Sequence, residues 1–339
     1  MSNNQPLLQI KGLKTSFFTP SGVVQAVRGV DLDLNRGQTM GLVGESGCGK
    51  SVMSLSILRL VPNPGRIVEG SISFQGQDLM KKTDKEMRSI RGNDISMIFQ
   101  DPMTSLNPTY TVGNQISESL RLHKKMNKRD ALDRSVELLE MVGIPSPADR
   151  IKQYPFEFSG GMRQRVMIAM ALACDPALLL ADEPTTALDV TIQAQIMELM
   201  KDLRAKVNTS VILVSHDLGV IADFCDVIKV MYAGIIAEEG AKRDIFYHAA
   251  HPYTQGLLKS IPKINTEHKS RLVPIDGQPP DLIAPPKGCP FADRCQYSMR
   301  LCRNQCPDLI EVSPGHRAAC WLTHPEAPKP EGYLKGASV

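Results

Sequence analysis

Short runs of consecutive apolar residues recur along the first two thirds of this chain and predict buried strands. The predicted strands lie at residues 7–10, 23–27, 30–34, 39–43, 70–74, 95–99, 178–181, 210–214 and 227–231. Their apolar positions are continuous rather than alternating, which is typical of a parallel sheet covered on both faces. Between about 112 and 174 the spacing is helical, with one apolar stripe formed by Leu132, Val136, Leu139 and Val142. The pattern therefore predicts an α/β fold that includes a helical region.

The composition of the chain changes after about residue 260. Half of its 24 prolines lie from Pro262 onward, so we expect regular helices and strands to be rare there. Five of the eight cysteines also fall in this part, between Cys289 and Cys320. We therefore expect a domain at residues 1–260, with a helical subdomain at about 101–175, and a separate extension at 261–339.

Length, charge and hydropathy narrow the class of protein. The chain has 339 residues, which is long enough for a large core and two or three subdomains. Its longest apolar stretch, Val166 to Cys174, is far shorter than the roughly 20 residues of a membrane span. No signal peptide begins at Met1, which predicts a cytoplasmic chain with reduced cysteines. Any membrane role is then expected to come through partners.

A phosphate-binding loop is the most specific motif in the chain. It fits the pattern G-x-x-x-x-G-K-[ST] and consists of Gly44, Glu45, Ser46, Gly47, Cys48, Gly49, Lys50 and Ser51. The glycines let backbone N–H groups approach the phosphates of ATP or GTP. Lys50 offers a positive charge to the β- and γ-phosphates, and Ser51 offers a hydroxyl to Mg²⁺. A strand before the loop and a helix after it would aim the helix N-terminus at the phosphates.

Two carboxylates follow the predicted strand at 178–181. Asp182, at the end of the strand, can bind Mg²⁺ through water. Glu183 would then project toward the γ-phosphate, where a base or water-orienting group is needed. Taken alone, the pair would be a strand ending in a solvated acidic turn. Because it follows a phosphate-binding loop, we favour the catalytic interpretation.

A second helix start suited to anions lies at Ser159, Gly160 and Gly161. Ser159 is a good N-cap for the apolar helix that follows, and the glycines open the approach to its N-terminus. A capped helix after a turn is the alternative interpretation of this segment alone.

Together these motifs resemble those of ABC-family ATPases. Residues 158–164 match the family's signature motif, with Phe158 in place of the usual Leu and Met162 in place of the usual Gln. The resemblance implies a RecA-like P-loop NTPase core with an antiparallel β subdomain, a helical subdomain and, here, a proline- and cysteine-rich C-terminal extension. It also implies that the chain binds ATP with Mg²⁺ and hydrolyses it.

The resemblance gives roles to residues outside the motifs above. Gln100 matches the Q-loop glutamine that contacts Mg²⁺ and couples to a membrane partner, and Asp189 belongs to a D-loop at 187–189. His216 matches the H-loop histidine that contacts the γ-phosphate. Phe17 lies where the family places an aromatic that stacks on adenine, and Phe18 is its close rival.

Two segments narrow the resemblance to the importer branch for oligopeptides, dipeptides and nickel. These are residues 98–108 and the run His251-Pro252-Tyr253-Thr254, and the match covers nearly all of residues 7–322. It implies a head-to-tail pair with a second, related ATP-binding subunit, and two permease subunits at the cytoplasmic face of the inner membrane. An extracytoplasmic peptide-binding protein would deliver the oligopeptide or dipeptide.

Four cysteines of the tail, Cys289, Cys295, Cys302 and Cys320, offer thiolates for Zn²⁺ or an iron–sulfur cluster. Paired C-x-x-C knuckles, the usual zinc signature, are absent from the sequence. In the resembled branch these positions match cysteines that can hold a [4Fe–4S] cluster, which we favour over zinc and over free buried thiols. Cys306 is a possible rival to Cys302. The cluster would cross-link the proline-rich tail, a segment with little hydrophobic core of its own.

The alternative function is that of a soluble ABC-type mechanochemical ATPase acting on nucleic acid or ribosomes. Such a protein would favour a long coiled coil, a zinc insertion or a strongly basic face. The sequence has no sustained heptads and a net charge of only +3, so we expect no nucleic-acid partner. A purely regulatory binding module would lack Glu183.

Overall fold

The computed structural model of the protein describes residues 5–101, 105–186, 188–260, 274–328, 330 and 333. The chain divides into two compact units. The first unit takes in the described parts of Met1–Leu34, Thr39–Asp78 and Ser215–Val339, and the second takes in Asn35–Gln38 and Leu79–Val214. None of the described helices is long and apolar enough to cross a bilayer.

An antiparallel sheet forms one layer of the first unit. Its strands run in the order β2-β1-β4-β5 and comprise β1 (Leu8–Thr19), β2 (Gly22–Leu34), β4 (Gly65–Phe74) and β5 (Gln77–Asp78). The two short strands predicted at 23–27 and 30–34 are one strand, because β2 pairs with β1 along its whole length, with bulges on the way. This sheet is the antiparallel subdomain that the sequence resemblance implied.

A second set of strands in this unit carries the phosphate loop. Their order is β11-β12-β10-β9-β3, with bounds β3 (Thr39–Val43), β9 (Val227–Tyr232), β10 (Ile235–Ala241), β11 (Ile310–Ser313) and β12 (His316–Ala318). Strands β3 and β9 are parallel, as predicted, whereas β10, β12 and β11 add to them in antiparallel fashion.

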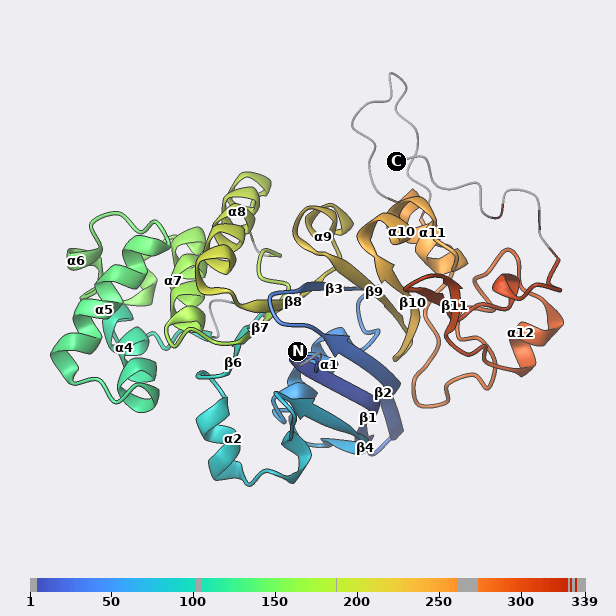
Figure 1. Ribbon diagram of the computed structural model, residues 1–339, viewed down its shortest axis with the longest axis horizontal. Helices are drawn as coiled ribbons and strands as arrows, with labels where there is room; N and C mark the ends of the chain where they lie inside the picture. Colours follow the sequence, from blue (N-terminus) through green and yellow to red (C-terminus); the bar gives the residue numbers. More distant parts are fainter. Residues whose placement is uncertain are drawn as a thin grey trace, which may run out of the picture. The chain divides into compact units, whose positions relative to one another are not determined.

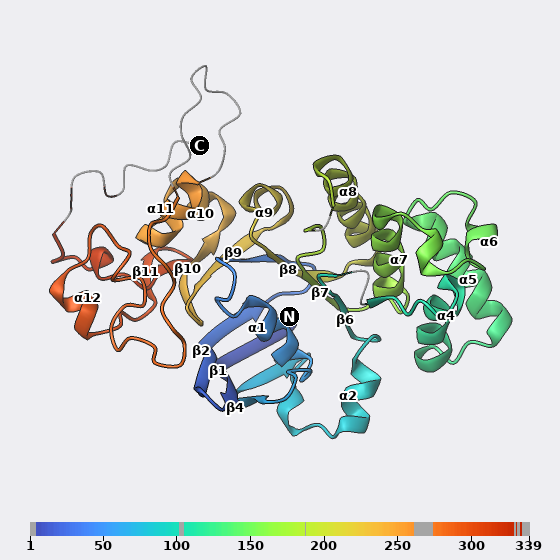
Figure 2. The same ribbon diagram turned by 180° about the vertical axis from the view of Figure 1, so that it is seen from behind.

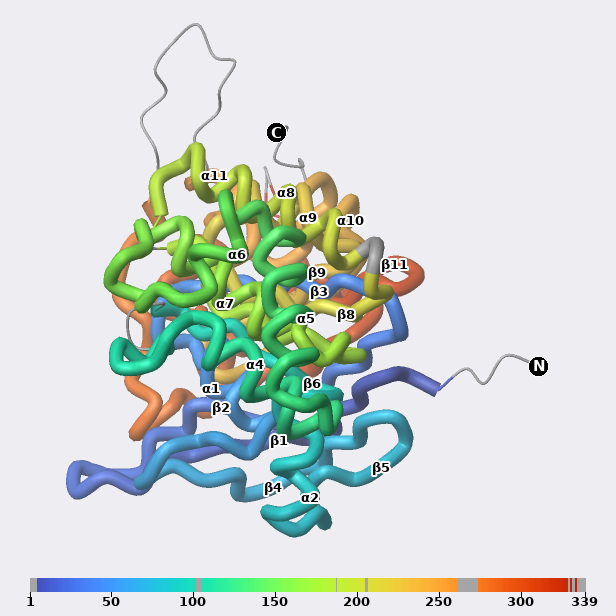
Figure 3. Tube along the Cα trace, turned by 90° about the vertical axis from the view of Figure 1, so that its left-hand side faces the viewer, coloured from blue at the N-terminus to red at the C-terminus, as the bar shows by residue number. Residues whose placement is uncertain are grey.

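The helices of the first unit are short. They are α1 (Lys50–Ile57), α9 (Leu218–Phe224), α10 (Lys242–Tyr247), α11 (Pro252–Lys259), α12 (Arg300–Asn304) and the 3₁₀ turn η3 (Trp321–Thr323). Helix α1 follows the phosphate loop and contacts β1 and β2 of the antiparallel sheet (Figure 3). Packing on that layer fixes the direction in which the N-terminus of α1 points.

The prediction that regular elements would be rare after residue 260 is wrong for 300–318. There α12 is followed by the β11–β12 hairpin, which lies at the edge of the sheet beside β10 (Figure 2). The prolines do not interrupt the strands, since Pro314 lies in the turn between them, next to Gly315 with φ 76°. The tail also has more core than expected, because Phe291, Ala318 and Leu322 are buried.

The second unit combines a parallel three-stranded set with most of the helices. The strands run in the order β8-β7-β6, with bounds β6 (Ile95–Ile98), β7 (Leu178–Asp182) and β8 (Ser210–Ser215). Its described α-helices and 3₁₀ turns are η1 (Leu79–Lys81), α2 (Asp84–Ile90), α4 (Val112–His123), α5 (Lys128–Met141), α6 (Pro147–Arg150), η2 (Pro155–Glu157), α7 (Gly160–Leu172) and α8 (Val190–Val207). Helices α4 to α7 lie together, in green in Figure 1, as the helical subdomain.

Helix α5 shows how tertiary packing moved the predicted apolar stripe. Leu139 and Val142 are buried, but Leu132 and Val136 are only half-buried. Ala131, one position before Leu132, is fully buried, since α5 packs between α4 and α7 and a small side chain permits their close approach.

Candidate nucleotide site and cysteine pocket

The phosphate loop between β3 and α1 requires its glycines. Gly44, Gly47 and Gly49 have φ values of 153°, 78° and 105°, a region that L side chains rarely adopt. A Cβ on Gly44 would lie 2.1 Å from the carbonyl oxygen of Met231, and one on Gly49 would lie 2.2 Å from that of Ala26. The loop is therefore held tightly against β9 and β2, while Gly47 faces open space.

Lys50 is the first residue of α1, and its side chain folds back over the loop. It is 5% exposed, and its Nζ donates to the carbonyl oxygens of Gly44 (2.8 Å) and Glu45 (2.9 Å). The ammonium group thus sits within the loop that would surround the phosphates. Cys48 in the same loop is buried, and burial raises the pKa of its thiol, so it is a packing residue rather than a nucleophile. Ser51 follows at the helix start and is half-buried.

The two carboxylates lie in the second unit, at the end of β7. Asp182 is its last residue and is 6% exposed. Glu183 follows with φ 46°, an uncommon conformation for a residue with a side chain. Its N–H donates to the carbonyl oxygen of Val214 in β8, at 2.9 Å, which holds the backbone in place. Backbone strain of this kind is concentrated at functional sites.

Gln100 and Glu183 are brought together in the second unit. The Nε2 of Gln100 donates to Oε2 of Glu183 at 3.1 Å, and Oγ1 of Thr186 donates to the same oxygen at 2.8 Å. The carboxylate therefore has a fixed orientation. Thr186 was not predicted from the sequence as a site residue, although its place in the turn after Glu183 is a signal that could have found it.

The signature segment begins α7, as predicted. Ser159 is the N-cap, and its side chain accepts from the N–H of Met162 at 3.4 Å. Gly161 lies against the start of α8, where a Cβ would come within 2.9 Å of Ile192. Phe158 is 2% exposed, so at this position the aromatic ring serves the core of the helical subdomain.

The segment that begins α8 is largely exposed. Asp189 is the N-cap, and its carboxylate accepts from the N–H of Ile192 at 3.0 Å. Val190 is 83% exposed, and Ser159 and Gly160 are also exposed. Ala187, the first residue of the predicted D-loop, lies outside the described residues.

His216 and the candidate adenine-stacking residues lie in the first unit. His216 follows β8 directly and is exposed. Phe17 in β1 is half-buried against Gly65, on which a Cβ would be 2.6 Å from the ring. Phe18 is 37% exposed, and the guanidinium of Arg66 covers one face of its ring at 4.1 Å.

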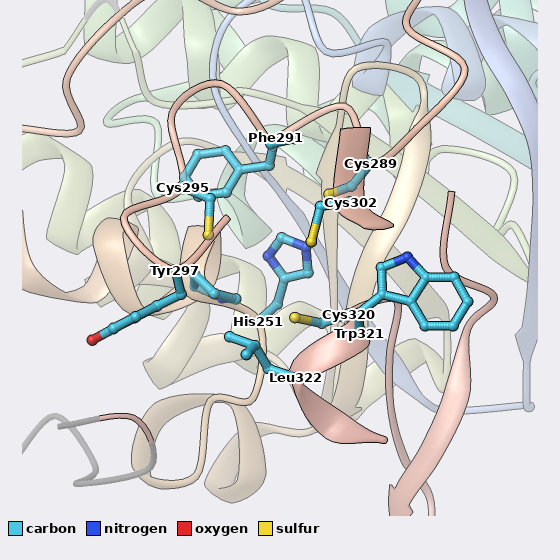
Figure 4. A pocket seen from close by; sticks show the side chains of 11 residues that line it. His251, Cys289, Phe291, Cys295, Tyr297, Cys302, Cys320, Trp321 and Leu322 are labelled. Carbon is cyan, nitrogen blue, oxygen red and sulfur yellow. The ribbon is translucent and has the colours of Figure 1, made fainter. Parts of the chain in front are cut away.

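The four predicted cysteine ligands line a single pocket in the tail (Figure 4). The pocket is lined by His251, Pro252, Cys289, Phe291, Ala292, Cys295, Tyr297, Cys302, Cys320, Trp321 and Leu322. Figure 4 shows the side chains of these four cysteines together with the His251 ring at the same pocket. Cys306 does not line this pocket, and its Sγ lies 3.8 Å from the carbonyl oxygen of Pro307.

The protonation of these groups follows from burial. Burial raises the pKa of Cys289 and Cys320 to about 12 and also raises that of Cys295. It lowers the pKa of His251 to about 4, so the ring is neutral at pH 7. The thiols become ligands only when a bound cation compensates the charge of the thiolates. Across the described part of the chain, no group of three or more His, Cys, Asp or Glu is arranged so that it could hold a metal ion.

Two family matches cover most of the chain. Residues 27–186 match the family described as ABC transporter, and residues 237–302 match the family described as oligopeptide/dipeptide transporter, C-terminal region. The first match contains the phosphate loop, Gln100, the signature segment and both carboxylates. The second contains His251 and the first three cysteines of the pocket.

Similar proteins and structures agree with these matches. The dipeptide transport ATP-binding protein DppD of Bacillus subtilis is 56% identical over 94% of this chain and 95% of its own length. The oligopeptide transport ATP-binding protein OppD of Escherichia coli is 50% identical over 93% of each. A dimeric post-hydrolysis structure of the ATP-binding cassette MJ0796, bound to ADP and Pi, has a TM-score of 0.63 at 28% identity. That alignment covers 70% of this chain and 99% of the cassette.

Proposed function

This chain belongs to the ABC transporter family of ATP-binding subunits, and from this premise we propose how its residues drive the import of oligopeptides or dipeptides. It is the ATPase subunit of an ABC importer, works with permease subunits and uses ATP with Mg²⁺. The observation that carries the proposal is the extent of the similarity, because both the ATP-binding part and the cysteine-bearing tail match peptide transport subunits.

Each candidate site residue has a distinct chemical task in this proposal. Lys50 neutralises phosphate charge, and Ser51 and Asp182 hold Mg²⁺, which when bound stabilises charge on the transferred phosphoryl group. Glu183 accepts the proton of the attacking water, and Gln100 holds that carboxylate in position through the 3.1 Å hydrogen bond. His216 donates to the γ-phosphate, and Phe17 stacks on adenine.

We propose a head-to-tail dimer in which each ATP is shared. The helix start at Ser159, Gly160 and Gly161 would face the phosphates bound by the other subunit, and Asp189 would lie near the same interface. Exposure of Ser159 and Gly160, and of the apolar Val190 at 83%, supports an interface on this part of the second unit. The partner is proposed to be a different, related ATP-binding subunit.

A groove on the helical subdomain is the proposed docking place for a permease. It is lined by Ser105, Asn107, Tyr110, Asn114, Gln115, Glu118, Arg121, Lys128 and Met170. The side chain of Gln115 shapes it by accepting from the N–H of Asn107 (2.9 Å) and donating to the carbonyl oxygen of Tyr110 (2.9 Å). Two permease subunits would hold the ATPase pair at the cytoplasmic face of the inner membrane. An extracytoplasmic binding protein would deliver the peptide.

The cysteine pocket is proposed to hold a [4Fe–4S] cluster. Four sulfur ligands around one pocket fit a cluster of this type, which takes a Cys₄ ligand set. Zinc is the alternative, since a Cys₄ ligand set also binds Zn²⁺. The bound cluster would supply cross-links that hold the tail together, as structural metals do in small segments.

ATP turnover with and without partners tests the proposed function. The purified chain should hydrolyse ATP slowly and should gain activity when the second ATP-binding subunit and the permease are added. Co-purification with nucleic acid or ribosomes, and no gain from the membrane partners, would instead favour the soluble mechanochemical class.

A further inference from the structure

A residue of the cysteine-bearing tail forms an ion pair with a residue of the phosphate loop. The guanidinium of Arg294 forms a two-pronged ion pair with Glu45, at 2.6 Å from Nη1 to Oε2 and 2.8 Å from Nη2 to Oε1. The two residues are 249 positions apart in the sequence, and both lie in the first unit. Fork-to-fork pairs of this kind are among the strongest and most directional contacts that proteins make.

Arg294 is itself held rigidly. Its Nε donates to the carbonyl oxygen of Asp276 (2.9 Å), and its Nη2 also donates to that of Ile275 (3.1 Å). Its Nη1 reaches the hydroxyl of Tyr232 at 3.1 Å. The side chain is only 5% exposed, whereas the Glu45 side chain is 27% exposed. The arginine is therefore a fixed support and the loop glutamate is the group that it positions.

A second group, the hydroxyl of Tyr253 in α11, holds the main chain of the same loop residue. The N–H of Glu45 donates to the hydroxyl oxygen of Tyr253, at 2.8 Å. The Tyr253 ring packs on Tyr232 and Phe291, with centroid distances of 4.5 and 5.4 Å. Glu45 is thus fixed through both its carboxylate and its backbone.

We infer that Arg294 and Tyr253 are positioning residues for the phosphate loop, through which the tail sets the affinity of the ATPase for nucleotide. They act on Glu45 and touch no substrate. Arg294 also neutralises a carboxylate that would otherwise face the triphosphate unpaired, and like charges at close range oppose binding. The inference rests on the proposed function, since it assumes that this loop binds ATP.

The same residues join the loop to the cysteine pocket. The residues next to them in the sequence line the pocket. Cys295 directly follows Arg294, and His251 and Pro252 directly precede Tyr253. Phe291, which packs on Tyr253, lines it as well. A tail that loses its fold would therefore release Glu45 from Arg294 and would remove the packing of Phe291 on the Tyr253 ring.

The test measures the Kd of a fluorescent, non-hydrolysable ATP analogue with Mg²⁺ on the full chain. R294Q should raise the Kd about tenfold, which corresponds to ~1.4 kcal/mol. E45Q should also raise the Kd, about threefold, because a glutamine amide keeps only part of the fork, and the R294Q/E45Q double variant should bind no more weakly than R294Q because both changes break the same pair. R294K and Y253F should each raise the Kd about threefold, or ~0.6 kcal/mol. R294K loses the two-pronged geometry of the ion pair with Glu45, and Y253F loses the hydroxyl that accepts from the N–H of Glu45.

R303Q is the matched control. Arg303 lies in the same tail and pairs with Asp293 at 2.9 Å, but both side chains are exposed and neither touches the loop. Its Kd should equal that of the wild type. Thermal melting identifies variants that fail to fold. If R294Q fails to fold, the Kd values of R294K and Y253F provide the test instead.

The possible results separate three accounts. A folded R294Q with wild-type Kd would overturn the inference, as would folded R294K and Y253F with wild-type Kd. Losses that simply add in the R294Q/E45Q double variant would show that Arg294 does not act through Glu45 and would also overturn it. A folded wild-type chain that does not bind the nucleotide would instead contradict the proposed function.

Discussion

The side-chain amide of Gln100 donates to the carboxylate of Glu183 at 3.1 Å, although the two residues are 83 positions apart. Both follow neighbouring parallel strands, since Gln100 comes after β6 and Glu183 after β7. The carboxyl ends of parallel strands meet at one edge of a sheet, where α/β proteins bind their ligands. A residue proposed to couple to the permease is therefore in contact with the proposed catalytic base.

Replacing the base should separate binding from hydrolysis. E183Q should retain MgATP binding but lower hydrolysis by about 10²–10⁴-fold, the usual contribution of a general base. Steady-state ATP turnover of the assembled transporter, with the Kd for nucleotide measured in parallel, provides the check. Near-normal turnover would remove Glu183 from the role of base. T186V, which deletes the other donor to the same oxygen, is the control and should have a much smaller effect.

Lys50 should matter for nucleotide binding itself. K50A removes the cation that lies inside the loop and should raise the Kd for MgATP at least about tenfold, because a positive charge that would face the phosphates is lost. K14A is a suitable control, since Lys14 is half-exposed and pairs with Glu69 at 2.6 Å on the antiparallel sheet. Equal affinities for K50A and the wild type would show that the phosphates bind elsewhere.

Turnover should depend on assembly. Because the Ser159 helix start is proposed to serve the nucleotide of the other subunit, the chain alone should be a poor ATPase. Its specific activity should increase with protein concentration or on addition of the partner subunit, as measured by phosphate release. Full activity that is independent of concentration in a monomer contradicts the shared site.

The tail should bind iron through the pocket cysteines. Anaerobically purified protein should contain iron and sulfide in a 1:1 ratio with visible absorption, and Cys→Ser changes at Cys289, Cys295, Cys302 or Cys320 should abolish it. C306S is the control that should spare the cluster, since Cys306 is not among the residues that line the pocket. Stoichiometric zinc without iron would replace the cluster with a zinc site, and loss of iron in C306S but not C302S would overturn the ligand assignment.

Local motifs made the elements that carry the candidate nucleotide site predictable from the sequence. The loop at 44–51 and the strand before Asp182 each lie within a dozen residues, so their pattern alone indicates both element and chemistry. The cysteine positions were also predicted, and the structure places all four in one pocket. The first half of the stripe on α5 was displaced by one residue, from Leu132 and Val136 to Ala131 and Ser135, because packing against α4 and α7 rather than hydrophobicity decides which side chain is buried.

Long-range relationships could not be predicted in this way. The Arg294–Glu45 pair joins segments 249 residues apart, and no local pattern marks either residue as a partner of the other. The hairpin at 310–318 was missed because proline content was counted over the whole tail. The proline position that matters, Pro314, lies in the turn, where proline favours the hairpin instead of breaking it.

Peptide uptake into proteoliposomes tests the central claim most directly. The complete transporter, with this chain, its partner subunit, the permeases and the binding protein, would be reconstituted and given a labelled oligopeptide or dipeptide. We predict accumulation that requires MgATP and is lost when this chain carries E183Q. Accumulation that proceeds equally well with E183Q or without ATP would contradict the account of this chain as the subunit that drives import.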